Sequence, residues 1–460
     1  MTPGYYTTPT CTGYQKRNLL LSYSSDVTAS QYLTQEVSMN KNDDSRLREF
    51  RQLKQEIRRS TEYLVVGIDV AKERHYAFFG TATGTTLIRK LVFTNTREGF
   101  EKLTFQADTL KVRHGLTKVV FGLEPTGDYH KPLGEYLNNN GHMVVFAANT
   151  AVKNNRELLN GRWDKNDTKD AANVADLVLQ GKCLFYEHPP LELQELRGLL
   201  SLKKKLKKQE HAYRVRIRNH LIAQYFPEID RYFNYGEGPA IVRSWLDPEA
   251  LAEASFEQFA SVVSSINGGQ KQILRLKEIH GAARTSIGCA VTPAVPFEAG
   301  LLFDALSRIK DMGKATDGKI ATVCKGFPEY RCLLSIPGFG PDISSKVLGA
   351  LSNPHRFENT RQLLKTAGLD LSGDKSGKRE GAMVISKKGK ADLRYGLYQA
   401  SLVASSSSRC FMEYFTNLVK GREREKGIGM KMRIKLSAKM LVIAWTLMKK
   451  EEMFDPGYLK

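Results

Sequence analysis

Short apolar runs alternate with helical segments between Tyr63 and about residue 181. Each run is bounded by turn-forming or charged residues and is rich in β-branched or aromatic side chains, a combination that favours buried strands. The runs are "YLVVGIDV", "HYAFFG", "TLIRKLVF", "KVVFGLE" and "HMVVFA". Helical periodicity occurs near residues 98–110, in "YHKPLGEYLNN" and in "DTKDAANVADLVLQ". Three successive strands followed by alternating helices and strands predict a mixed α/β sheet with helices on both faces.

Helices are predicted for most of the rest of the chain. One begins near Leu191, and the segment 229–325 keeps helical periodicity between Gly- and Pro-containing breaks. The apolar face of the helix near Leu191 is expected to consist of Leu199, Leu200, Leu202, Leu206 and Tyr213. Before the sheet, polar Ser/Thr/Tyr-rich sequence gives way to the charged stretch "DDSRLREFRQLKQEIRRS", which predicts a disordered tail and then a short helix.

These changes in texture divide the chain into four regions. Residues 1–60 form an N-terminal extension that is disordered in part, and 61–185 form the α/β domain. Residues 186–325 form a helical or coiled-coil region, and 326–455 form a mainly α-helical C-terminal domain that begins Gly-rich and becomes strongly basic. A chain of 460 residues is long enough for two or three domains with separate cores.

Four carboxylates stand where a metal site can form. Asp69 ends the first apolar strand, and Glu124 ends the strand "KVVFGLE". Asp167 and Asp170 are three residues apart, so both lie on one face at the start of a helix. A carboxylate at a buried strand end is costly unless a hydrogen bond, a cation or a metal compensates it. Such hard oxygen ligands suit Mg²⁺ or Mn²⁺, and a pair of these ions assists phosphodiester chemistry.

Each acid also has a purely structural explanation. Asp170 can stabilise its helix through the dipole, Asp167 can cap that helix, and Glu124 can pair with Lys72 or Arg74. The combination of a strand-end Asp, a strand-end Glu and a helical D-x-x-D in this order favours the metal site over these separate explanations.

The C-terminal region contains two features suited to DNA contact. The stretch "LLSIPGFGPDISSKVLGAL" predicts a helix-hairpin-helix-like element in which Gly338 and Gly340 expose backbone N–H groups to a phosphate; a plain helix connection is the alternative. Further on, Ser372 and Ser376 each precede a glycine in a basic loop. A serine that attacks a phosphodiester needs close backbone approach and neighbouring cations, although most serines in such loops are turn residues. The cations of this loop are Lys375, Lys378, Arg379, Lys387, Lys388 and Lys390.

The charge of the chain indicates a polyanionic partner. The formal net charge is +20 and the pI is about 9.5, which favours nucleic acid. The candidates for phosphate contact on the basic helix are Lys203, Lys204, Lys205, Arg214, Arg216 and Arg218, with a solvated charged face as the alternative.

Other compositional signals narrow the class of protein. No apolar run reaches the roughly 20 residues of a membrane span, and the N-terminus lacks a signal-peptide pattern, so an intracellular soluble protein without a membrane partner is expected. The six cysteines are scattered with no C-x-x-C pair, which argues against a zinc site or a disulfide framework.

Taken together, the motifs resemble those of the DEDD transposases of bacterial insertion sequences, the group described as bridge-RNA-guided recombinases. The stretches "GIDVAKERHYAF", "LEPTGDYH" and "NDTKDA" are similar to the family's RuvC-like domain, which has the RNase H fold. The stretches "LLSIPGFGP", "AGLDLSGDKSGK" and "ISKKGKADLR" are similar to its C-terminal transposase domain. The order of the motifs over residues 62–450 is specific, whereas no single motif is.

The resemblance implies a mechanism. The metal-binding acids would be Asp69, Glu124, Asp167 and Asp170, with Mg²⁺ or Mn²⁺ as the cofactor, and the nucleophile would be Ser376. The serine would form a covalent phosphoserine link to DNA in a composite site assembled between protomers of a dimer or tetramer. A guide (bridge) RNA that pairs with donor and target DNA would supply sequence choice, and the protein would be bacterial, cytoplasmic and nucleoid-associated.

Two other functions stay open. A RuvC-like endonuclease could resolve branched DNA by hydrolysis, although such an enzyme needs little beyond the nuclease fold and this chain has a long basic C-terminal domain. A non-catalytic nucleic-acid-binding protein could retain the fold, although all four acids are present.

Overall fold

The computed structural model describes residues 41–160, 167–235, 237–264, 269–373, 375–376, 379–380 and 383–459. Within these residues a sheet of six strands has the order β3-β2-β1-β4-β5-β6. The strands are β1 (Tyr63–Asp69), β2 (Arg74–Thr81), β3 (Thr86–Thr94), β4 (Lys118–Leu123), β5 (Met143–Phe146) and β6 (Leu184–Phe185). Strands β1, β4 and β5 are parallel, whereas β2, β3 and β6 join by antiparallel pairing. The predicted mixed sheet is confirmed.

Helices cover both faces of this sheet. On one face, α2 (Arg97–Arg113) and α3 (His130–Asn139) pack against a core that contains Leu64 and Val66 of β1. On the other face, α1 (Lys41–Glu56) and α5 (Asp167–Leu179) pack against a core that contains Tyr63 and Val65. Successive side chains of a strand point to opposite faces, so β1 contributes to both cores. The short helix predicted before the sheet is α1.

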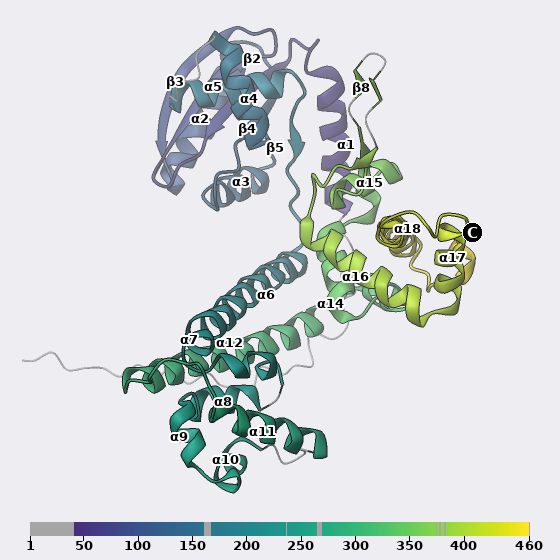
Figure 1. Cartoon of the computed structure of the whole chain (residues 1–460). Coiled ribbons are helices and arrows are strands. Elements are labelled where there is room, and N and C mark those ends of the chain that lie inside the picture. The colour runs from purple at the N-terminus through teal and green to yellow at the C-terminus, as the bar shows by residue number, and fades with distance from the viewer. Residues whose placement is uncertain are drawn as a thin grey trace, which may run out of the picture. The chain divides into compact units, whose positions relative to one another are not determined.

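Two long helices lie side by side beyond the sheet in sequence. These are α6 (Leu191–Arg216) and α12 (Ala294–Cys324), which pack along each other (Figure 1). Smaller helices between them in the sequence build a core of their own around Phe226 and Phe259. They are α7 (Ala223–Tyr225), α8 (Gly238–Ser244), α9 (Pro248–Glu253), α10 (Phe256–Val263) and α11 (Gln270–Ala283), with a π-helical turn at Ile217–Ile222 and a 3-10 turn at Pro227–Tyr232. The mainly helical character predicted for 229–325 is confirmed.

The C-terminal helices share a further core with the start of α6. They are α13 (Pro328–Leu334), α14 (Pro341–Leu351), α15 (Thr360–Ala367), α16 (Ala391–Ser407), α17 (Arg409–Val419) and α18 (Ile428–Lys450). Leu196 of α6 belongs to this core together with Leu348 of α14 and Leu397 of α16. Between α15 and α16, β7 (Leu371–Ser372) pairs with β10 (Val384–Ile385), and β8 (Lys375–Ser376) pairs with β9 (Arg379–Glu380). The exact domain boundaries stay a prediction.

The predicted apolar face of α6 is wrong at one position. Leu202 is 40% exposed, whereas the adjacent Lys203 is buried. The Nζ atom of Lys203 forms ion pairs with Asp317 of α12 (2.6 Å) and Asp342 of α14 (2.5 Å). Two carboxylates compensate the desolvated ammonium, so a lysine occupies the contact between three helices.

The structure also bears on membrane insertion and thiol chemistry. Among the described helices, none is long and apolar enough to cross a membrane. Five cysteines are free thiols: Cys183, Cys289, Cys324, Cys332 and Cys410. The sixth, Cys11, lies outside the described residues.

Candidate active site

The sheet brings Asp69 and Glu124 to one edge. Strands β1 and β4 are adjacent and parallel, with Ile68 opposite Leu123. Asp69 is the last residue of β1, Glu124 directly follows β4, and the backbone N–H of Glu124 donates to the carbonyl oxygen of Ile68 (3.3 Å). Both acids are half-buried. The carboxyl ends of neighbouring parallel strands therefore place these two residues beside each other, as the sequence predicted.

Close packing of α5 on β1 adds Asp170 to the same region. Gly67 of β1 lies two residues before Asp69, and a Cβ atom there would stand 2.2 Å from the carbonyl oxygen of Ala171 and 2.5 Å from the backbone N of Ala175. Asp170 directly precedes Ala171, so it belongs to the turn of α5 that touches β1. Asp167 is the first residue of α5, and its side chain lies outside the described residues.

Asp170 is buried and is paired with a cation of the chain itself. Its Oδ1 accepts a hydrogen bond from Nε of Arg156 on α4 (Asn149–Asn160) at 2.8 Å. The side chains of Asp170 and Arg156 are 1% and 18% exposed. Arg156 is therefore the compensating charge for this carboxylate, and the sequence analysis missed it because α4 was not predicted.

His75 orients the turn that follows Asp69. The backbone N–H of Ala71 donates to Nδ1 of His75 at 3.2 Å. The ring is fully buried and lies against Phe93 and Phe100. Burial lowers the pKa of His75, which keeps the ring neutral and Nδ1 able to accept. A single histidine in an apolar strand carries no sequence signal that separates this role from ordinary packing.

The donor set suits a hard divalent cation in its chemistry. Carboxylate oxygens are the ligands that Mg²⁺ and Mn²⁺ prefer. Over the part of the chain that the structure describes, however, no three His, Cys, Asp or Glu side chains are gathered closely enough to hold a metal. The side chain of Asp167 is not among the described ones, and Asp170 is paired with Arg156. Arg156 engages Oδ1 of Asp170, so a metal bound to this carboxylate would share it with Arg156 or displace Arg156.

The candidate nucleophiles lie in the short strand pairs of the C-terminal region. Ser372 is exposed in β7 opposite Val384. Ser376 ends β8 and stands opposite Arg379, the first residue of β9. The side chains of 374–380, which include Lys375, Ser376, Lys378 and Arg379, lie outside the described residues. Of the remaining cations, Lys387 and Lys388 are exposed.

Most of the predicted phosphate-contacting side chains around α6 have partners within the protein. Besides Lys203, the pairs are Lys204 with Asp392 (2.7 Å), Arg214 with Asn234 (2.9 Å), Arg216 with Glu298 (2.7 Å) and Arg218 with Asp230 (2.6 Å). Lys205 is exposed. Several of the charges on and directly after this helix are therefore compensated within the protein, whereas Lys205 has no salt bridge to a described residue.

The helix-hairpin-helix-like element is formed by α13, α14 and the turn between them. Helix α13 ends at Leu334 and α14 begins at Pro341. Gly338 has φ +86°, and a Cβ atom there would stand 2.5 Å from the carbonyl oxygen of Ala400 on α16, so packing alone requires glycine. Gly340 has open space around it. A phosphate contact at this turn stays a prediction.

Comparisons with known proteins indicate the class of protein to which this chain is similar. Residues 66–227 match the DEDD transposase model of the IS110 group, described as "Transposase", and this range contains all four acids. Residues 330–416 match the model described as "Transposase IS116/IS110/IS902 family", a range that contains both serines. A protein of Coxiella burnetii, "Transposase for insertion sequence element IS1111A", is 23% identical over 304 residues, which are 64% of this chain and 69% of that protein.

The α/β fold, the acids at its sheet edge and these matches support a transposase. Within that class, they support an insertion-sequence transposase of the IS110 family, a group of DNA-processing enzymes. The class predicted from the sequence is confirmed at this level.

Proposed function

We propose that this protein cleaves and exchanges DNA strands under RNA guidance, using an acid cluster and a serine nucleophile. The observation that carries the proposal is the adjacency of Asp69 and Glu124 at the ends of β1 and β4, with α5 packed directly on β1 at Gly67. Asp167 and Asp170 contribute further oxygen ligands from α5. Bound Mg²⁺ or Mn²⁺ would stabilise the charge that develops on the phosphate oxygens.

Ser376 is the nucleophile in this proposal. Its hydroxyl oxygen attacks the phosphorus atom of a phosphodiester, a bond from phosphorus to a deoxyribose oxygen breaks, and the serine proton passes to a neighbouring base or to water. One DNA end becomes bound to Ser376 and the other carries a free hydroxyl. Attack by the hydroxyl of another strand then restores the serine and joins the strands.

The serine and the acids come from different regions of the chain, so the proposed site is composite. It forms by docking of regions or of protomers in a dimer or tetramer, which keeps the nucleophile away from the acids until DNA partners are bound. A guide RNA that pairs with donor and target DNA supplies sequence choice. The family resemblance supports this division of labour, as does the net charge of +20.

The test is a denaturing gel of the reaction with labelled DNA, Mg²⁺ and RNA transcribed from the flank of the element. The wild-type protein should give a covalent protein–DNA adduct and recombined product. Ser376→Ala should still bind nucleic acid but give neither, whereas Ser372→Ala should retain the adduct. Asp69→Ala and Glu124→Ala should abolish cleavage and leave binding largely intact.

Other outcomes would select another function. An adduct that persists in Ser376→Ala would move the nucleophile to another residue. Cleavage by the wild-type protein with no adduct would favour a hydrolytic nuclease, and cleavage at wild-type rate in Glu124→Ala would remove the acid cluster from the mechanism. Equal site choice with and without the RNA would remove the guide.

A further inference from the structure

A basic groove lies where α6, α14 and α16 meet. Its volume is about 900 Å³. Its charged lining consists of Arg197, Lys203, Lys204, Lys207, Lys346 and Lys390 together with Asp342 and Asp392. Cations therefore outnumber carboxylates along the groove, which favours an anionic occupant.

Some of these cations are already compensated. Lys203 and Lys346 share Asp342, at 2.5 and 2.6 Å, and Lys204 pairs with Asp392 at 2.7 Å. Through Lys203 and Lys204, these pairs join α6 to α14 and α16, the helices that line the groove.

Two lining cations differ from the rest. Neither Lys207 nor Lys390 forms a salt bridge to any residue that the structure describes. Lys207 is exposed, and Nζ of Lys390 donates to the carbonyl oxygen of Ala350 at 2.9 Å. Desolvation of its ammonium, together with the nearby guanidinium groups of Arg197 and Arg356, lowers the pKa of Lys390 to about 8. An anion in the groove would meet two cations that form no salt bridge to a described residue, although Glu187 offsets part of the charge of Lys390.

The groove also offers an aromatic ring and a limited volume. Tyr395 of α16 belongs to the lining and is 62% exposed. Exposed aromatic rings beside basic side chains stack on unpaired bases. The volume falls in the range of roughly 300–1,000 Å³ that holds a drug-sized molecule, which a few unpaired nucleotides can fill. A duplex keeps its bases paired and stacked, so it offers Tyr395 no free base to stack on.

We infer that this groove binds a short single-stranded segment of nucleic acid, with Lys207 and Lys390 on its phosphates and Tyr395 stacked on a base. The inference rests on the proposed function, in which strand exchange and RNA pairing both require unpaired nucleotides. An unpaired DNA strand and an unpaired RNA segment share this chemistry, and the 2′-hydroxyl distinguishes them.

The experiment measures binding of the full chain by fluorescence anisotropy. Three labelled probes of one sequence are used: single-stranded DNA, single-stranded RNA and duplex DNA. The variants are Lys207→Ala and Tyr395→Ala, and Lys208→Ala is the matched control. Lys208 is exposed on the same helix and carries the same charge, but it does not line the groove.

Tyr395→Ala should weaken binding of a single-stranded probe about 5- to 100-fold and leave duplex binding unchanged within twofold. Lys207→Ala should reduce the slope of log K against log salt by about 0.7 for single strands. Lys208→Ala should match the wild type. The single-stranded probe that shows the larger effect identifies the DNA or RNA source.

Single-stranded binding by Lys207→Ala and Tyr395→Ala equal to that of Lys208→Ala would overturn the groove, and so would an equal loss of duplex binding. The adduct assay separates this result from the proposed function. If the wild-type protein forms the adduct and the groove variants bind single strands normally, the groove hypothesis is rejected and the proposed function stands. If the wild-type protein forms no adduct but the groove variants bind single strands more weakly, the serine mechanism is rejected and the groove hypothesis stands.

Discussion

At the scale of single residues, the ion pair between Arg156 and Asp170 links the fold to the proposed chemistry. The carboxylate is almost fully buried, and the guanidinium is its compensating charge at 2.8 Å. Removing one partner of a buried pair leaves the other charge uncompensated. A divalent cation at the acid cluster would supply the same compensation, and we propose that it competes with Arg156 for Asp170.

We expect Arg156→Ala to reduce the free energy of unfolding by about 3 kcal/mol in a chelator. Mn²⁺ should then raise its melting temperature more than that of the wild type, because ligand binding stabilises the folded state by mass action. Thermal unfolding over a Mn²⁺ series measures both effects. Arg97→Ala is the control, since its pair with Glu101 is largely exposed, and it should change stability by less than about 1 kcal/mol. If Mn²⁺ raises the melting temperatures of Arg156→Ala and the wild type equally, Arg156 and the metal do not compete for Asp170.

The sequence indicated where some residues of the candidate site lie and gave no sign of others. Asp69 and Glu124 end apolar runs, and strand polarity then brings them together. Arg156 and Lys203 gave no such signal, because their roles depend on tertiary partners; Asp342 lies 139 positions from Lys203. A lysine in a basic run is ordinarily solvated, and only the fold shows which of these lysines forms ion pairs with two carboxylates.

At the scale of elements, the contact between α5 and β1 determines where Asp170 stands. Gly67 allows the helix backbone to touch the strand, and Gly122 on β4 lies under Val174 and Val178 in the same way. Larger side chains at these positions would lift α5 from the sheet. The two glycines therefore control the separation between the helical and the strand-end acids.

Gly67→Ala is expected to destabilise the protein by about 3 kcal/mol or more, because the new methyl group overlaps backbone atoms that cannot move independently. It should also suppress cleavage, since Asp170 moves away from Asp69. Urea unfolding and the cleavage assay measure the two effects. Gly198→Ala is the control: this glycine lies in α6 with open space around it, and alanine there should stabilise by up to about 1 kcal/mol. Unchanged stability in Gly67→Ala would contradict the close contact.

Element prediction succeeded where the apolar pattern was strong. The strands from β1 to β5 and helices α2, α3 and α5 follow their sequence periodicity. Helix α4 was missed because "NTAVKNNRELLN" is rich in asparagine, which has low helix propensity, and it is held by contacts with α5. Strand β6 was missed because it has only two residues, too few for a pattern.

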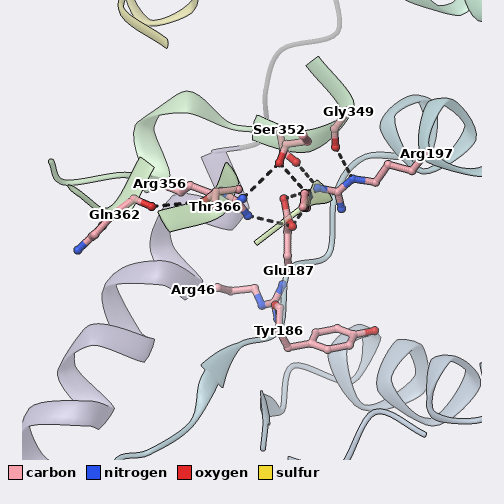
Figure 2. Close-up of polar contacts among 11 residues, drawn as sticks. Arg46, Tyr186, Glu187, Arg197, Gly349, Ser352, Arg356, Gln362 and Thr366 are labelled. Atoms are coloured by element: carbon pink, nitrogen blue, oxygen red, sulfur yellow. Dashed lines mark hydrogen bonds and ion pairs between the residues drawn. The ribbon is translucent and has the colours of Figure 1, made fainter. Parts of the chain in front are cut away.

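At the scale of the whole molecule, Glu187 joins segments that are far apart in sequence. It lies between β6 and α6 and accepts from Arg197 of α6 (3.0 Å) and Arg356 (3.0 Å), as Figure 2 shows. Arg197 also donates to the Ser352 hydroxyl and to the carbonyl oxygen of Gly349 (2.9 Å). Burial by itself would raise the pKa of Glu187, but Arg356, Arg197 and the Ser352 hydroxyl hold that pKa below its ordinary value.

This lowered pKa makes stability depend on acid pH. A carboxyl group with a lower pKa in the folded state stabilises above its unfolded pKa, near 4.3, and loses that contribution as pH falls through the folded value. We expect Glu187→Gln to reduce the free energy of unfolding by about 3 kcal/mol at neutral pH. Its stability should also fall less steeply than that of the wild type below about pH 4.5. Unfolding free energies measured between pH 3 and 7 test this, and parallel curves for the two proteins would contradict it.

The pairing of α6 with α12 sets an order for folding. Lys203 and Asp317 meet at 2.6 Å although about 110 residues separate them, so this contact must close a long loop at an entropic cost. The helices between them have their own core around Phe226 and Phe259, built from contacts of shorter range. Once that core has formed, the remaining flexible chain between α6 and α12 is short and the cost of closure falls. The two long helices are therefore expected to join late, after the segment that they enclose has folded.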